Sequence, residues 1–77
     1  MNMEKLELGK YRHYKGHFYE VMAVGKDSES LEDVVIYMAL YNSEEFGDNA
    51  VWVRSLKEFV ENVEIDGNDV SRFKLAE

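Results

Sequence analysis

The stretch from Gly9 to Val24 constrains the fold of this chain more than any other segment. It gathers aromatic and imidazole rings and three cations around Gly16, and it then passes directly into an apolar run. Aromatic residues favour strands, and a glycine takes the positive φ of a tight turn without a steric cost. We therefore predict a short strand, a turn at Lys15 to His17, and a long strand from Phe18 to Lys26.

The long strand is apolar on both of its faces. Side chains alternate along a strand, which puts one set on one face and the other set opposite: Tyr19, Val21 and Ala23 against Phe18, Glu20, Met22 and Val24. Two apolar faces indicate a small curled sheet whose outer face is also partly covered.

Five further elements follow along the chain. Val34 to Tyr41 begins with β-branched residues and reads as a second strong strand, and Ala50 to Arg54 reads as a third. Ser55 and Glu58 have the spacing of a capping box, and apolar residues then recur at helical spacing: Leu56, Phe59, Val60 and Val63. The end of the chain predicts a strand, an Asp-Gly turn and a closing strand from Val70 to Phe73.

These elements predict a mainly β fold, a small SH3-like antiparallel β-barrel with one short helical turn near residues 55–62. A chain of 77 residues has room for a single domain, 1–77, in which residues 1–8 are either a frayed leader or the start of the first strand. We assign five side chains to the core: Tyr19, Val21, Val35, Phe59 and Val63.

Composition excludes several classes of protein. The chain has no cysteine, so disulfides and thiolate metal sites are excluded, and it has no apolar run as long as the roughly 20 residues of a membrane span. Its first residues do not resemble a signal peptide, and we expect a cytoplasmic protein. The formal net charge is −7, and from Asp27 onward four basic residues stand against 13 acidic ones. Such acidity disfavours general nucleic-acid binding, and its simplest role is solubility.

The sequence contains no recognisable catalytic apparatus. His13 and His17 are four residues apart, but Gly16 and the surrounding rings argue for strand and turn, no third ligand lies nearby, and we expect neither a metal nor a cofactor. An acid–base pair could be formed by His13 and Glu29 if the fold brings them together. A small hydrolase-like enzyme built on that pair is the alternative to a non-catalytic protein.

A better-supported group combines rings and cations: Tyr11, His13, Tyr37, Trp52, Arg54 and Arg72. Tyr and Trp supply contact area at low entropic cost, and the arginine guanidinium matches carboxylate or phosphate. We therefore predict a binding module for a protein segment or a small anionic ligand. Two alternatives remain for these residues: the rings belong only to the core, or exposed rings stack on single-stranded nucleic acid.

The ordered combination of these segments resembles the bacterial domain-of-unknown-function family 1653. The resemblance runs from Gly9 to Phe73 and rests on Gly9 to Gly16, Tyr19 to Val21, Ser28-Glu29, Val35 to Tyr37, Ala39 to Tyr41, Trp52 to Arg54, Phe59, Val63, Asp66-Gly67 and Arg72-Phe73. It implies an SH3-like barrel and no assigned activity. The chain departs from the family pattern at Ser55, where the pattern has proline. The pattern also has a basic residue near the position of Met38.

Overall fold

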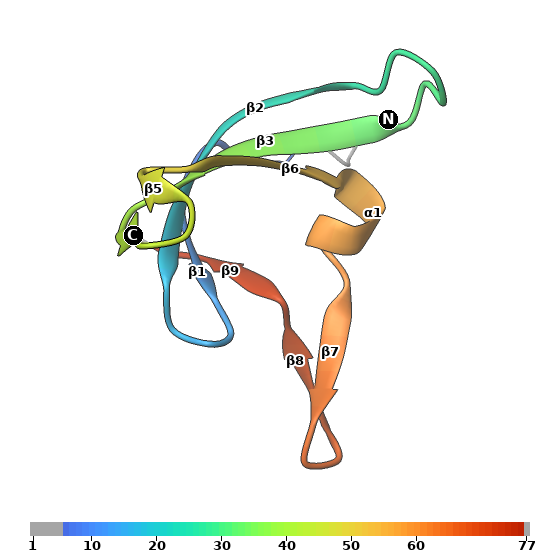
Figure 1. Ribbon diagram of the computed structural model, residues 1–77. Helices are drawn as coiled ribbons and strands as arrows, with labels where there is room; N and C mark the ends of the chain where they lie inside the picture. Colours follow the sequence, from blue (N-terminus) through green and yellow to red (C-terminus); the bar gives the residue numbers. More distant parts are fainter. Residues whose placement is uncertain (1–5, 77) are drawn as a thin grey trace.

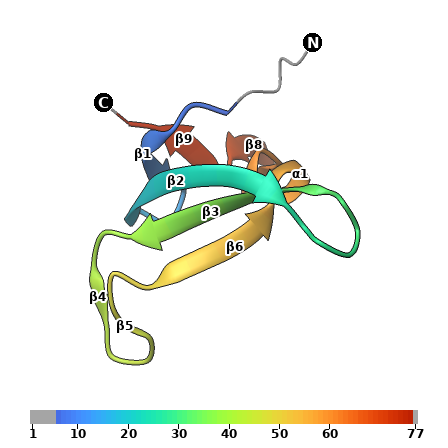
Figure 2. The ribbon, with the colours of Figure 1, turned by 90° about the horizontal axis from the view of Figure 1, so that it is seen from above.

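The fold is organised by one antiparallel sheet of five strands. The computed structural model describes residues 6–76. The strands are β1 (Gly9–His13), β2 (Phe18–Lys26), β3 (Asp33–Ala39), β6 (Val51–Ser55) and β9 (Phe73–Leu75), in the order β6-β3-β2-β1-β9. Figure 1 shows β2, β3 and β6 crossing above the rest of the chain, and Figure 2 shows the same three strands side by side from above. A mainly β, antiparallel fold is confirmed.

The remaining elements are small and lie at the margins of the sheet. A hairpin of β4 (Asn42–Ser43) and β5 (Gly47–Asp48) extends one end, while the one-turn helix α1 (Leu56–Phe59) follows β6. A second hairpin, β7 (Asn62–Ile65) with β8 (Asn68–Ser71), hangs below the sheet beside α1 (Figure 1). Within residues 6–76 the edge strands β6 and β9 do not pair, so the sheet is bent without closing into a hydrogen-bonded barrel.

A β-bulge in β2 contributes to the bend of the sheet. Val21 pairs with Tyr37, but the register then shifts so that Ala23 pairs with Ile36. The extra residue inverts the alternation of side chains and increases the local twist. Ala23 is consequently exposed on the outer face, although strict alternation predicts it beside Val21. The inner face continues at Val24, which pairs with the fully buried Val35.

The short helix begins as the capping pattern predicts and ends early. The Ser55 hydroxyl oxygen accepts the backbone N–H of Glu58 at 3.1 Å. Phe59 points inward and is 1% exposed, but Val60 is 56% exposed. The helix ends at Phe59 and the chain extends into β7, so the predicted helical spacing does not continue through Val60 and Val63.

Both tight turns occur where the sequence predicts them. Gly16 has φ of +107°, and Asp66 and Gly67 have φ of +52° and +81° between the paired residues of the β7–β8 hairpin. The predicted closing strand, however, is divided at Arg72. Its backbone N–H donates to the Glu61 carbonyl while its own carbonyl accepts from Tyr14, so β8 stays with β7 and β9 joins β1.

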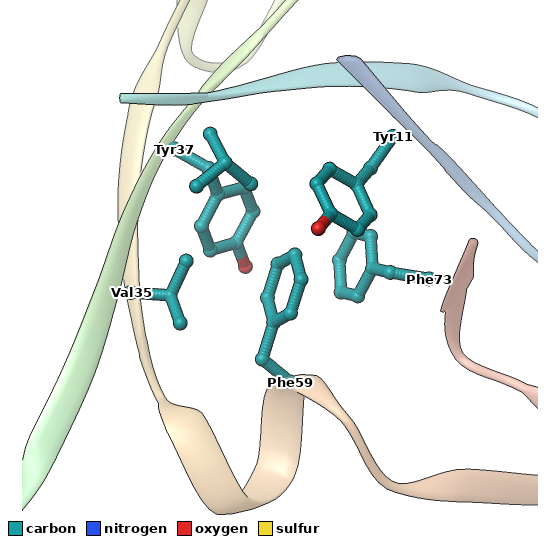
Figure 3. Close-up of a cluster of buried hydrophobic side chains, with 6 residues drawn as sticks. Tyr11, Val35, Tyr37, Phe59 and Phe73 are labelled. Carbon is teal, nitrogen blue, oxygen red and sulfur yellow. The ribbon is translucent and has the colours of Figure 1, made fainter. Parts of the chain in front are cut away.

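The core lies between the inner face of the sheet and α1. Figure 3 shows Phe59 pointing from α1 toward the rings of Tyr11, Tyr37 and Phe73. The rings of Phe59 and Phe73 stack at 4.1 Å with an interplanar angle of 3°. Of the side chains assigned to the core, Val21, Val35 and Phe59 are fully buried. Tyr19 packs against the core with partial exposure, and Val63 lies outside it.

The expectation of a frayed leader or first strand over residues 1–8 lies mostly outside the described residues, which begin at Leu6. Leu6 packs against the core, and β1 begins at Gly9.

No helix in the part of the chain that the structure describes is long and apolar enough to span a membrane.

Replacing Phe59 tests whether this ring holds the fold together. Because Phe59 is fully buried and stacked on Phe73, we expect Phe59→Ala to lower the free energy of unfolding by about 3–5 kcal/mol. Urea denaturation followed by circular dichroism measures the change. Val60→Ala, one residue along and mostly exposed, is the matched control and should change it by less than about 0.5 kcal/mol. Equal losses in the two variants would contradict the packing described here.

Candidate functional site

Aromatic rings form a continuous path from the core to the surface near the β1–β2 turn. Phe73 contacts Tyr19 at 5.6 Å, Tyr19 contacts Tyr41 at 5.6 Å, and Tyr41 stacks on His17 at 4.2 Å. Phe73 is buried, Tyr19 and Tyr41 are partly exposed, and His17 is exposed. The polar atoms of these rings therefore lie toward the exposed end of the path, on Tyr19, Tyr41 and His17.

Arg54 is held among these rings, and no acidic side chain of residues 6–76 pairs with it. Its Nε donates to the Tyr37 hydroxyl at 3.2 Å, and its Cζ lies 5.9 Å from the centre of the Phe73 ring. No carboxylate of residues 6–76 lies within 4.0 Å of its guanidinium, although the chain has 16 acidic residues and only nine Lys or Arg. The guanidinium is thus positioned by neutral groups, and its two terminal nitrogens have no ion-pair partner among the described residues.

His13 lies beside the same rings, with its ring centre 4.9 Å from that of Phe73 and 6.2 Å from that of Tyr19. Its Nδ1 accepts the backbone N–H of Lys15 at 3.1 Å, so in the neutral ring the proton is on Nε2. Burial lowers the pKa of His13, and the positive charges of Arg54, Lys15, Arg72 and His17 lower it further. Every charge that shifts this pKa is positive, which shows a local positive potential in a chain with a net charge of −7.

Two tyrosine hydroxyls complete the polar part of the cluster. The hydroxyls of Tyr19 and Tyr41 lie 2.8 Å apart and share one hydrogen bond. Burial and this bond raise the pKa of Tyr19 well above its ordinary value, so its phenol stays protonated at neutral pH. We call the group formed by His13, Tyr19, Tyr37, Tyr41 and Arg54 the Arg54 cluster.

The structure places the six predicted binding residues in four different settings. His13, Tyr37 and Arg54 come together, although the Tyr37 ring is buried and only its hydroxyl serves the cluster. Tyr11 lies in the core, where it is 6% exposed and its hydroxyl donates to the Glu7 carbonyl. Arg72 fastens two parts of the fold, because its Nε donates to the Glu58 carbonyl and its Nη2 bonds the Glu61 carboxylate at 3.4 Å.

Trp52 borders the cluster on the inner face of β6. It pairs with Tyr37 across the strands and meets the exposed Phe46 ring edge-on at 5.0 Å. Its indole Nε1 is buried and has no hydrogen-bond partner among residues 6–76. Trp52 and Arg54 are therefore on one face, as a binding surface requires.

Sequence reasoning missed Tyr41 and assigned Tyr19 wholly to the core. The strand alternation placed Tyr19 on the inner face, but only its position near the end of the strand signalled that its hydroxyl reaches the surface. Tyr41 follows β3, where no pattern predicts its bond to Tyr19. Both differences have one cause: the sequence does not show which end of the inner face α1 covers.

The histidine–glutamate pair required for an acid–base enzyme does not form in this structure. His13 ends β1 beside the β1–β2 turn, whereas Glu29 lies in the loop beyond the other end of β2. The nine-residue strand β2 separates the two side chains, and Glu29 is exposed. Over residues 6–76 there is also no group of three or more His, Cys, Asp or Glu side chains that could hold a metal ion.

Comparison with known proteins now supplies the family. The family described as "Protein of unknown function (DUF1653)" matches residues 9–75. The chain belongs to this family. A crystal structure of a DUF1653 protein from Bordetella bronchiseptica is similar, with a TM-score of 0.84 and 29% sequence identity over 97% of this chain and 92% of that one. Among functionally curated proteins there is no match.

Membership of DUF1653 confirms the resemblance seen in the sequence and brings no activity with it. The similar crystal structure shows that the bent sheet with its short helix is an arrangement that another member of the family also adopts. Any statement about the function of this DUF1653 protein therefore depends on its own side chains, and above all on the Arg54 cluster.

The pKa of His13 tests the positive potential of the cluster. We expect His13 to titrate below the ordinary value of about 6.5, and Arg54→Met to raise its pKa because one positive charge is removed while burial remains. NMR titration of the imidazole Cε1 protons measures the shift. The unfolded chain binds this proton more readily, so protonation of His13 lowers stability as the pH falls below about 6.5. A pKa of His13 unchanged by Arg54→Met would show that the two groups do not interact.

Proposed function

We propose that this DUF1653 protein is a binding module that holds the carboxylate of a small ligand or a protein segment at the Arg54 cluster. One observation carries the proposal: Arg54 is positioned by Tyr37 and Phe73 and has no carboxylate partner among residues 6–76. An arginine that only stabilised an acidic domain would be expected to pair with one of its many acids, as Arg72 does with Glu61.

The chemistry of the cluster suits a planar anion. The bond from Nε to Tyr37 leaves the two terminal nitrogens of Arg54, and a carboxylate can accept from both in a bidentate pair. The hydroxyls of Tyr19 and Tyr41 share one hydrogen bond, which leaves one O–H of the pair to donate to a ligand, and the neutral His13 ring has its proton on Nε2. The surrounding positive charges favour an anion over a neutral ligand.

The rings beside the cluster suit the rest of such a ligand. His17 and Tyr41 stack at an exposed position, and Phe46 is 58% exposed against Trp52. Aromatic surfaces of this kind bind apolar or planar groups with little loss of side-chain entropy. We propose no catalytic step, because His13 and Glu29 lie at opposite ends of β2. The cytoplasm remains the location that we propose from the sequence.

Benzoate, a ring with one carboxylate, is a direct probe of the proposal. We expect benzoate to shift the amide resonances of His13, Tyr19, Tyr41 and Arg54 in ¹⁵N-labelled protein and to change the fluorescence of Trp52, the single tryptophan. Arg54→Met should weaken binding at least about 10-fold, since a hydrogen-bonded ion pair contributes about 1.5–3 kcal/mol. A short peptide with a free carboxyl end, compared with its amidated form, extends the test to protein segments.

Lys26→Met is the control for this experiment. It removes one positive charge from an exposed position at the far end of β2, and benzoate binding should change less than about 2-fold. Thermal unfolding followed by circular dichroism verifies that both variants are folded. Equal benzoate affinity of the wild type and Arg54→Met would refute the proposal.

A further inference from the structure

The outer face of the sheet contains two cations placed directly opposite one another. Arg12 in β1 pairs with Lys74 in β9 across the antiparallel ladder, and both side chains are exposed. Directly opposed residues have Cβ atoms about 4.5–5.5 Å apart, and like charges in that position are destabilising. Two other cations of the described residues do have acidic partners, Lys26 with Asp33 and Arg72 with Glu61.

A hollow of about 120 Å³ opens where these two cations lie. It is formed where β1, β8 and β9 meet, and six residues line it: Arg12, His13, Tyr14, Val70, Ser71 and Lys74. Five of the six carry a side-chain hydrogen-bond donor, and none carries a carboxylate. The hollow is therefore lined by donors from β1, β8 and β9 and from the start of the β1–β2 turn.

No acid of the described residues neutralises the pair. Neither Arg12 nor Lys74 has a carboxylate within 4.0 Å among residues 6–76, and Asp69, which precedes the lining residue Val70, is not part of the hollow. Although the chain has 16 acidic residues, none of those described pairs with these two cations. The cations and the donors of the hollow are therefore available to an external anion.

We propose that this hollow binds a phosphate monoester group, with Arg12 and Lys74 as its charged ligands and Ser71 and Tyr14 as neutral donors. A phosphate monoester carries about −1.5 to −2 charges at neutral pH and three terminal oxygens, which matches two cations and several donors. A carboxylate has one charge and two oxygens and matches the Arg54 cluster better. Arg12 and Lys74 lie on the outer face of the sheet, Arg54 lies on the inner face, and His13 borders both sites.

The first experiment titrates the ¹⁵N-labelled protein with inorganic phosphate and with glycerol phosphate at constant ionic strength. We expect shifts of the amide resonances of Arg12, Tyr14, Ser71 and Lys74, and a rise in the unfolding temperature with phosphate concentration. Arg12→Gln and Lys74→Gln should each weaken binding at least 10-fold. In phosphate-free buffer neither variant should unfold at a lower temperature than the wild type, because each removes a like-charge contact.

Two controls make this result specific. Lys26→Gln removes the same charge at the far end of β2, and its affinity for phosphate should change less than 2-fold. Arg54→Met should retain phosphate binding even if benzoate binding is lost, so failure of either proposal is distinguishable from failure of the other. Equal affinity for phosphate in Lys26→Gln, Arg12→Gln and Lys74→Gln would overturn the site in favour of a diffuse charge effect.

The source of the phosphate is decided by a second comparison. A phosphoserine peptide that binds at least 10-fold more tightly than glycerol phosphate, with shifts of the same amides, would identify a phosphorylated protein segment. Equal affinities would identify a small phosphorylated molecule, and both results support a monoester site. A short single-stranded oligonucleotide that binds more tightly than either, with the same amides shifted, would overturn the monoester assignment, since its diesters carry one charge each.

Discussion

The stack of Phe59 on Phe73 is the contact on which the rest of this structure depends. The edge strands β6 and β9 do not pair in the described structure, so hydrogen bonds alone do not close the sheet. Phe59 follows β6 and Phe73 begins β9, and their rings meet at 4.1 Å between the two edges. A small domain has a thin core. One aromatic contact therefore connects the two edges of the sheet, which backbone hydrogen bonds connect in a closed barrel.

The same packing explains why the Arg54 cluster exists. The helix covers one end of the inner face, and rings at the other end are left partly exposed. Phe73 connects the two regions, because it contacts Phe59 on one side and Tyr19 on the other while Arg54 lies above its ring. The Arg54 side chain belongs to one edge strand and Phe73 to the other. The guanidinium therefore connects the two edge strands of the open sheet, and this contact helps to fix its position.

Charge is distributed in this protein by strand rather than spread evenly. The chain up to Lys26 has five Lys or Arg against three Glu, whereas the remainder is strongly acidic. Strand β1 therefore presents its cations Lys10 and Arg12 outward, and Lys15 lies in the turn that follows. The net charge of −7 repels anions in general, so an anion can bind only where positive side chains gather.

The sequence by itself determined the local elements: the turn at Gly16, the strand from Phe18 to Lys26, the Ser55 cap and the Asp66-Gly67 hairpin all follow from backbone propensities and short-range hydrogen bonds. It also indicated that rings and Arg54 belong together. Only the tertiary structure decided which rings are buried, because the bulge after Val21, the early end of α1 and the division of the last strand at Arg72 each depend on long-range packing. For the same reason the bond between Tyr19 and Tyr41, which are 22 residues apart, left no pattern in the chain.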